Sequence, residues 1–128
     1  MKEKYPKTNY ELVYLEKTTR GQVETVLRAK QLMDSENPLI IYNIDTHFIS
    51  SRLKSKILTL KNQNIDGMLG CFRSDDENLS FVELDEKGLV KRVREKEKIS
   101  SLASTGLYVF SNGRQFIEAA ETLSLIHI

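Results

Sequence analysis

Strand-like and helix-like segments alternate along the first half of the chain, and this order most constrains the fold. Alternating apolar residues predict a strand at 10–16, and the apolar run LIIY predicts a buried strand at 39–42. Between them, apolar side chains at helical spacing predict a helix over 22–34. A second helix is predicted over 52–61, with Leu53, Ile57 and Leu60 facing inward. A β-α-β-α order is typical of an α/β fold in which helices cover a parallel sheet.

Strand-like segments dominate the second half of the chain. The predicted elements are strands at 66–72, 79–84, 89–93 and 105–110. A helix capped by Ser111 or Asn112 follows, with Phe116, Ala119 and Ala120 on one face. The turn sequence DEKG separates the second and third of these strands, which predicts an antiparallel hairpin. The expected architecture is therefore α/β, with a mixed, mostly parallel sheet and helices on both faces.

Charge and cysteine content exclude several classes of protein. The 128 residues hold 19 basic and 18 acidic side chains, a net charge of +1, which excludes a strongly basic nucleic-acid surface. No apolar run approaches the roughly 20 residues of a membrane helix, and the N-terminal decapeptide has no apolar signal core. We therefore expect no nucleic-acid or membrane partner. Because Cys71 is the one cysteine, an internal disulfide is impossible, which favours a cytoplasmic location.

Two residues stand at positions where α/β folds bind ligands. Asp45 comes just after the predicted strand at 39–42, and ligands bind at the carboxyl ends of such strands. Its carboxylate can hold a divalent cation on a phosphate-bearing substrate, or it can accept backbone N–H groups in a turn. Gly21 opens a helix, which suits close approach of a nucleotide, or it is a turn glycine with positive φ. Spacing alone leaves both alternatives open at both positions.

Other polar residues give weaker indications. The charge run RVREKEK at 92–98 is either a solvated strand edge or a place where one lysine meets an anion. His47 has no second histidine or cysteine cluster nearby, which favours a packing role over metal binding. Cys71 lies in an apolar segment without a local base and is expected to be inert. No GxSxG, CxxC, HExxH or Walker motif occurs in the sequence.

Two long stretches carry a family resemblance. TTRGQVETVLRAKQLMDSENPLIIYNIDTHF has a glycine-initiated helix, an apolar strand and then an aspartate; SFVELDEKGLVKRVREKEKISSLASTGLYVF has a hairpin, a Glu-Lys pair and a Gly-Leu-Tyr-x-Phe strand. Together they resemble the sugar-nucleotidyltransferase family, which joins a sugar 1-phosphate to a nucleotide and releases pyrophosphate. The ending STGLYVFSNGRQFIEAAE is similar to a branch linked to capsule and surface-polysaccharide synthesis. The resemblance covers about residues 10–121 and implies a Rossmann-like nucleotide-diphospho-sugar transferase fold.

The resemblance also implies ligands and residue roles. The substrates would be a nucleoside triphosphate and a sugar 1-phosphate, the cofactor Mg²⁺, and the intact protein a possible homo-oligomer. Asp45 would be a ligand of the magnesium ion, Glu95 would accept hydrogen bonds from sugar hydroxyls, and Lys96 would pair with the sugar phosphate. The remaining implied residues are Gly21, Gln22 and Thr25 for the nucleotide, and Thr105 and Gly106 for the sugar.

The sequence departs from the family pattern in ways that affect catalysis. It contains neither the glycine-rich phosphate loop nor the second magnesium carboxylate, and Ser80 and Glu97 stand where many members have glycine and proline. We therefore expect residues 1–122 to be a partial nucleotidyltransferase domain, inactive alone, from an active parent protein. One reverse translation of LSLIHI, residues 123–128, matches a transposon end used in sequencing adapters. We expect this tail to be non-native and His127 to carry no chemistry.

Three other interpretations remain to be weighed against this one. Asp45 also fits a phosphoacceptor receiver domain, although the segment before Tyr10 supplies no acidic pair. NIDT partly matches a haloacid-dehalogenase motif, but Asn43 stands where that chemistry needs its nucleophile. A non-catalytic nucleotide-sugar-binding or regulatory remnant of the same fold would bind ligand without turnover.

Overall fold

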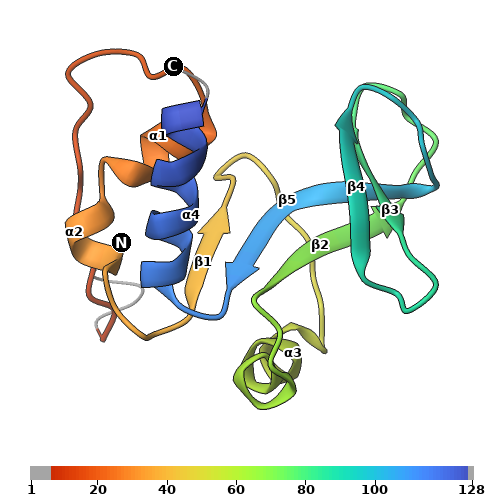
Figure 1. The fold of residues 1–128 in the computed structure, drawn as a ribbon, viewed down its shortest axis with the longest axis horizontal. Helices are drawn as coiled ribbons and strands as arrows, with labels where there is room; N and C mark the ends of the chain where they lie inside the picture. Colours follow the sequence, from red (N-terminus) through yellow and green to blue (C-terminus); the bar gives the residue numbers. More distant parts are fainter. Residues whose placement is uncertain (1–6, 127–128) are drawn as a thin grey trace.

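The computed structural model describes residues 7–126, which form one sheet with helices beside it (Figure 1). The strands are β1 (Leu39–Tyr42), β2 (Gly67–Arg73), β3 (Ser80–Leu84), β4 (Val90–Glu95) and β5 (Leu102–Phe110). The helices are α1 (Gln22–Leu27), α2 (Lys30–Met33), α3 (Leu53–Thr59), the 3-10 helix η1 (Lys61–Gln63) and α4 (Gly113–Ile126). The predicted strands after residue 38 are confirmed, as is the hairpin.

The longest strand, β5, is the centre of the sheet. One edge of β5 pairs with β2. The other edge pairs with β1, which ends with Tyr42 opposite Leu107, and with β3, which meets β5 at Phe81 opposite Ala103. The fourth strand, β4, pairs with β3 at the outside of the sheet.

The strand directions refine the predicted parallel sheet. All four pairings among the described strands are antiparallel, in contrast to the mostly parallel pairing that the alternating pattern predicts. Because β1 and β2 both pair antiparallel with β5, they run in the same direction, as a β-α-β connection through α3 requires. The late strand β5 lies between them, so the two parallel strands share no hydrogen bonds. The chain keeps a mixed α/β architecture.

Two predicted elements near the N-terminus differ in the structure. The predicted strand at 10–16 is irregular and exposed, because no described strand lies beside it to accept its backbone hydrogen bonds. The predicted helix over 22–34 is divided into α1 and α2 at Arg28 and Ala29. There the N–H groups donate to carbonyls three residues back, which tightens and ends the first helix.

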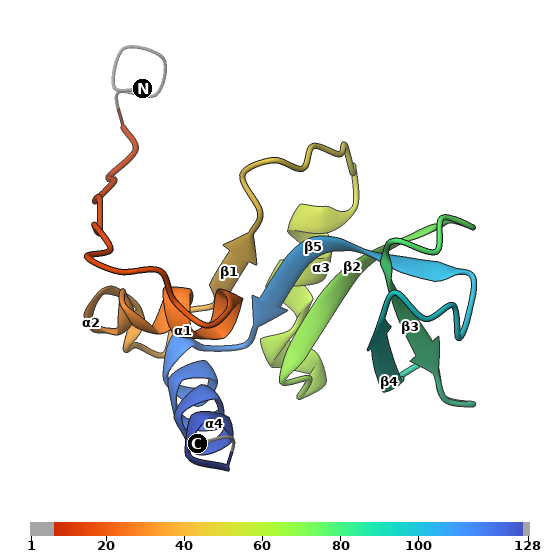
Figure 2. The ribbon, with the colours of Figure 1, turned by 90° about the horizontal axis from the view of Figure 1, so that it is seen from above.

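Helix α3 lies on one side of the sheet and α4 on the other (Figures 1 and 2), and apolar side chains gather between the sheet and each helix. On the α3 face, Leu60 packs with Leu107 and Val109, joined by the predicted inward residues of α3. On the other face, Phe116, Ile117 and Ala120 of α4 pack against side chains of α1, α2 and β1. The prediction for α4 is therefore corrected at one position, because Ala119 is exposed and Ile117 takes its place.

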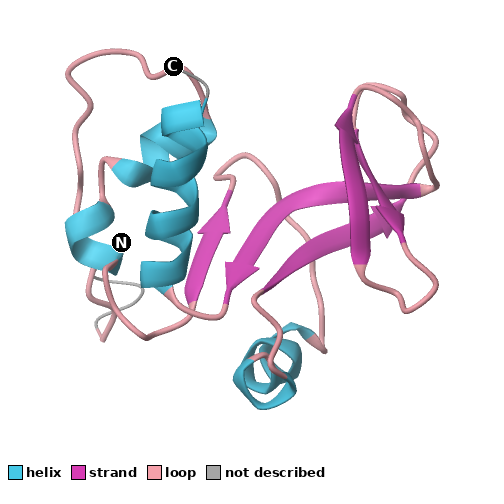
Figure 3. Cartoon of the chain, in the orientation of Figure 1, coloured by secondary structure: helices cyan, strands magenta, loops and turns pink. Residues whose placement is uncertain are grey.

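A short loop leads from β5 into the helix α4 (Figure 3), and hydrogen bonds and ion pairs fix the start of this helix. The side-chain oxygen Oδ1 of Asn112 accepts from the N–H of Gln115 at 2.8 Å, so Asn112 is the cap. Arg114 binds Asp34 at 3.0 Å and Glu36 at 2.7 Å, and these carboxylates raise the pKa of the guanidinium. The helix includes residues 123–126 of the predicted non-native tail, while 127 and 128 lie outside the described residues. Within the described part, no helix is long and apolar enough to cross a membrane.

Phe81 generates a prediction about the junction of β3 and β5. Its side chain is 0% exposed, and its backbone pairs with both neighbouring strands. We expect Phe81→Ala to lower the free energy of unfolding by about 3–5 kcal/mol, through lost burial and the remaining cavity. Chemical denaturation measures this. Leu84→Ala, at a 41% exposed position of the same strand, is the control and should cost less than about 1 kcal/mol.

The exposed segment at 10–16 generates a prediction about self-association. Leu12 is 66% exposed and Tyr14 is 83% exposed, so this segment presents large apolar side chains to solvent. We expect light scattering to show aggregation, and the double variant Leu12→Lys/Tyr14→Lys to reduce it without moving the unfolding midpoint. Leu58→Lys replaces an exposed leucine outside the segment. An equal reduction by this control would assign aggregation to overall charge instead.

Candidate functional site

The candidate site lies at a gap in the strand pairing along one edge of β5. There, β1 pairs as far as Leu107, and β3 pairs at Ala103. None of the described strands pairs with the edge of Ser104, Thr105 and Gly106 between them. The end of β1 and the start of β3 therefore face each other across three residues of β5.

A direct contact joins the end of β1 to this gap. Gly106 has a φ of +77°, which favours glycine, and an added Cβ would lie 2.6 Å from Nδ2 of Asn43. The Nε2 group of Gln22 donates to Oδ1 of Asn43 at 2.7 Å, so this amide is held by α1 and directed at β5. The structure thus connects Gln22 and Gly106, both predicted site residues, through one side chain.

Asn43 is a functional candidate that the sequence reasoning did not include. The sequence shows it directly after a buried strand and two residues before Asp45. Its position predicts only that it lies near the strand end. Its amide contacts Gln22, which is 21 residues earlier, and Gly106, which is 63 residues later. No local sequence pattern predicts contacts over such separations.

Asp45 lies in the turn that follows β1. The N–H of Thr46 donates to the carbonyl of Asn43 at 3.4 Å, and the phenol of Tyr42 donates to the carbonyl of Thr46. The hydroxyl of Thr46 donates to Oδ1 of Asp45 at 3.3 Å. Within the described part of the chain, no backbone N–H donates to the Asp45 carboxylate, so the turn-forming alternative is not adopted. The carboxylate is exposed at the end of β1.

The acidic side chains of the described chain limit how it could bind a magnesium ion. No group of three or more acidic, histidine or cysteine side chains converges among the described residues. Mg²⁺ on phosphate substrates takes one or two protein carboxylates, and phosphate and water oxygens complete its shell. The exposed Asp45 carboxylate fits one such ligand position.

The turn before α1 is held by several hydrogen bonds. Gly21 has a φ of 174°, extended backbone that any residue adopts, so the positive-φ alternative is wrong. Its carbonyl accepts hydrogen bonds from the N–H and the hydroxyl of Thr25, both at 3.1 Å. In this structure, the Thr25 side chain therefore stabilises the first turn of α1. The backbone N–H and guanidinium of Arg20 lower the pKa of the Glu24 carboxyl. Gly21 and Gln22 line a cavity of about 480 Å³ between α1 and α4.

Glu95 and Lys96 lie at the β4 end of the hairpin. Glu95 is opposite Ser80, the first residue of β3, which is the end of β3 nearest the gap in β5. Lys96 has a φ of 54°, an uncommon conformation for a residue with a side chain, and its N–H donates to the carbonyl of Leu79 at 2.9 Å. The register therefore places both predicted sugar-phosphate residues on the side of the gap opposite Asn43.

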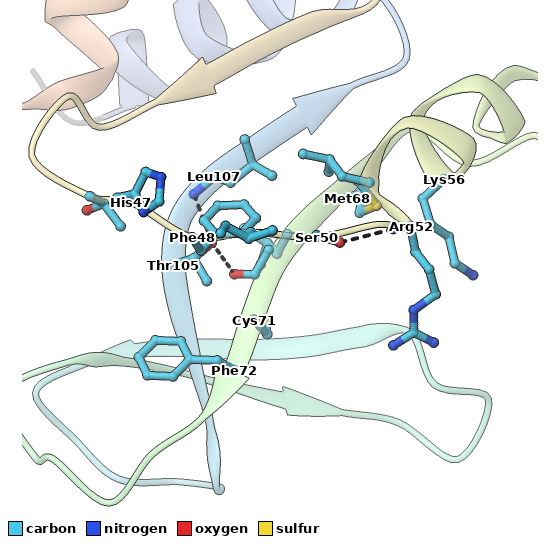
Figure 4. A pocket seen from close by; sticks show the side chains of 15 residues that line it. His47, Phe48, Ser50, Arg52, Lys56, Met68, Cys71, Phe72, Thr105 and Leu107 are labelled. Atoms are coloured by element: carbon cyan, nitrogen blue, oxygen red, sulfur yellow. Dashed lines mark hydrogen bonds between the residues drawn. The ribbon is translucent and has the colours of Figure 1, made fainter.

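Thr105 lies on the other face of β5 from the Asn43 contact. Its hydroxyl donates to the carbonyl of Gly70 in β2 at 3.1 Å, and it lines a cavity on the α3 face (Figure 4). Thr105 and Gly106, predicted to line one side of a cleft, are thus directed to opposite faces. His47 and Cys71 line the same α3-face cavity, and partial burial raises the pKa of the cysteine thiol.

The contact between Gly106 and Asn43 generates a double-variant prediction. We expect Gly106→Ala to lower stability about 1–3 kcal/mol more than Gly88→Ala, because the new methyl group meets the amide. Gly88 is a matched control, since its φ is +78° but its Cβ direction is open. In an Asn43→Ala background the nearest remaining atom is 3.5 Å away, so the two alanine variants should cost the same by chemical denaturation. A persistent difference would contradict the assigned contact.

Comparisons with known proteins place this geometry in a family. A family model described as nucleotidyl transferase matches residues 2–124. A nucleoside-diphosphate-sugar pyrophosphorylase from Vibrio cholerae RC9 is 32% identical, with a TM-score of 0.64 over 86% of this chain and 46% of that chain. A comparison with curated proteins finds no significant match.

A second solved structure supports the fold alone. It is assigned as a glucose-1-phosphate thymidylyltransferase from Bacillus anthracis, solved with a sucrose, and is 18% identical. Its TM-score is 0.62 over 75% of this chain and 39% of that chain. The present chain thus spans less than half the length of both solved structures. The chain belongs to the nucleotidyl transferase family.

Proposed function

We propose that this chain contributes the nucleotide- and sugar-phosphate-binding part of a sugar-1-phosphate nucleotidyltransferase. The observation that carries the proposal is the link from Gln22 through Asn43 to Gly106, with Asp45 two residues beyond the amide. The link joins the helix start, the carboxyl end of β1 and the gap in β5. Those are the places where an α/β sheet holds a phosphate-bearing ligand.

The reaction is substitution at the α-phosphorus of a nucleoside triphosphate. An oxygen of the sugar phosphate forms the new bond to this phosphorus, and the bond to the leaving pyrophosphate breaks. Such transfer depends on positioning and on neutralising the charge that develops on the phosphate oxygens. Bound Mg²⁺ would supply part of that neutralisation, with Asp45 as one ligand. Glu95 would bind sugar hydroxyls and Lys96 the sugar phosphate.

We infer that the chain is part of a longer enzyme that supplies the missing phosphate loop and second carboxylate. The coverage of 46% of the Vibrio cholerae structure supports this. A cytoplasmic role in surface-polysaccharide synthesis is the biological setting that we propose, based on the stretch STGLYVFSNGRQFIEAAE. Residues 123–128 stay assigned to a non-native tail in this proposal.

A binding remnant without catalysis is the second candidate. The gap beside Asn43 and the cavity next to Gly21 both lie in the described chain, which supports ligand binding by this part of the fold. The two candidates differ in turnover. If the complete parent protein is an enzyme, it releases pyrophosphate from a nucleoside triphosphate and a sugar 1-phosphate. If it is a remnant, it binds the nucleotide but releases no pyrophosphate.

Asp45 generates a prediction about magnesium-dependent nucleotide binding. We expect Asp45→Asn to weaken binding of the magnesium–nucleotide complex about tenfold or more, because the amide carries no charge to hold the cation. Amide NMR titration of the chain with UTP, dTTP, CTP and GTP, with and without magnesium, measures this. In the complete protein, the same change should abolish most pyrophosphate release across a panel of sugar 1-phosphates.

Asp66→Asn is the matched control, because Asp66 is exposed and its carboxylate makes no hydrogen bond or ion pair within the described chain. This control should bind nucleotide as the original chain does. Equal binding and equal pyrophosphate release by the Asp45 variant would show that the metal assignment is wrong. Nucleotide binding that is unaffected by magnesium would lead to the same conclusion.

A further inference from the structure

A cavity of about 680 Å³ lies on the α3 face of the sheet, away from the Asn43 contact (Figure 4). It is formed by the loop after β1, by α3, by β2 and by two residues of β5, Thr105 and Leu107. Since the nucleotide-side residues pack toward α1 and α4, β5 separates the two places. Apart from Thr105, which the resemblance assigns to the sugar, the residues that line the cavity have no role in the function proposed above.

Two cations and no acidic residue line the cavity. Arg52 and Lys56 lie one turn apart at α3, since the N–H of Lys56 donates to the carbonyl of Arg52 at 3.1 Å. Both side chains extend from the helix on the same side (Figure 4). Neither forms an ion pair within the described part of the chain, and no aspartate or glutamate is among the lining residues. In a chain of nearly balanced charge, this local excess of two positive charges favours a dianion.

The rest of the cavity wall is largely apolar and partly exposed. Phe72 is 44% exposed, Ile49 is 91% exposed, and Phe48 packs edge-on against Tyr42 with ring centroids 5.7 Å apart. Exposed apolar surface beside two unpaired cations is suited to a ligand with an apolar body and an anionic group. The hydroxyl of Thr105 already donates to the carbonyl of Gly70 in β2.

We propose that this cavity binds a small organic phosphate monoester whose body is flat and apolar. Arg52 and Lys56 bind the two charges of the phosphate group, and Phe72 with Ile49 covers the body. A sugar phosphate lacks the apolar body, and a neutral aromatic compound lacks the charge, so each meets only half of the site.

The probe that tests this is 2-naphthyl phosphate, titrated into the chain and followed by amide NMR. We expect saturable binding with a Kd of about 1 mM, and shifts in the amides of 46–50 and 68–72. 2-Naphthol and glucose 1-phosphate should bind about tenfold more weakly at these amides, since each lacks one of the two recognised features. The glucose 1-phosphate arm also separates this site from the proposed substrate site.

Variants of α3 separate specific recognition from net charge. Arg52→Gln and Lys56→Gln should each weaken 2-naphthyl phosphate binding about tenfold. Lys54→Gln removes the same charge from the same helix at a residue that does not line the cavity, and should leave the Kd unchanged. Phe72→Ala should weaken the binding of 2-naphthyl phosphate without unfolding the chain. The amide NMR spectrum of each variant checks that the fold is retained.

Three results would overturn the proposal. The first is absence of saturable binding to the original chain. The second is equal weakening by Lys54→Gln and Lys56→Gln, which would assign the effect to overall charge. The third is glucose 1-phosphate or 2-naphthol binding as tightly as 2-naphthyl phosphate at the cavity amides.

Discussion

Hydrogen bonding by β5 is the interaction on which the rest of the structure depends. This strand pairs with β1, β2 and β3, and its side chains enter the apolar clusters on both faces. Leu107 and Val109 are buried against the α3 face, while Phe110 packs with α4 on the other. Because β1 and β2 are both hydrogen-bonded to β5 and not to each other, the β-α-β unit requires a strand that follows about 30 residues later in the chain.

The same strand creates the candidate site by leaving part of its edge unpaired. Where β1 ends and β3 begins, Gly106 adopts a left-handed conformation and accommodates the Asn43 amide. A side chain at this position would push the amide away and release its bond to Gln22. The glycine thus determines the position of a helix-start residue 84 places earlier in the chain, which explains how the site depends on the sheet.

Local sequence signals predicted the elements whose stability is local. The hairpin followed from its turn, where the carboxylate of Asp85 accepts from the N–H of Lys87 at 2.8 Å and of Leu89 at 2.9 Å. The inward face of α3 followed from helical spacing. The prediction of a strand at 10–16 was wrong because this segment has no partner among the described strands. The placement of β5 between β1 and β2, and hence Asn43 beside Gly106, depends on long-range pairing that periodicity does not encode.

The two candidate binding places share structural elements although they lie on opposite faces. In the turn after β1, Asp45 stands next to Thr46, which lines the α3-face cavity. In β5, Gly106 contacts Asn43 while the adjacent Thr105 lines that same cavity. One peptide unit joins the two residues in each case, so the turn after β1 and residues 105–106 of β5 belong to both places. A ligand that displaced either segment would therefore alter the geometry available to a second ligand.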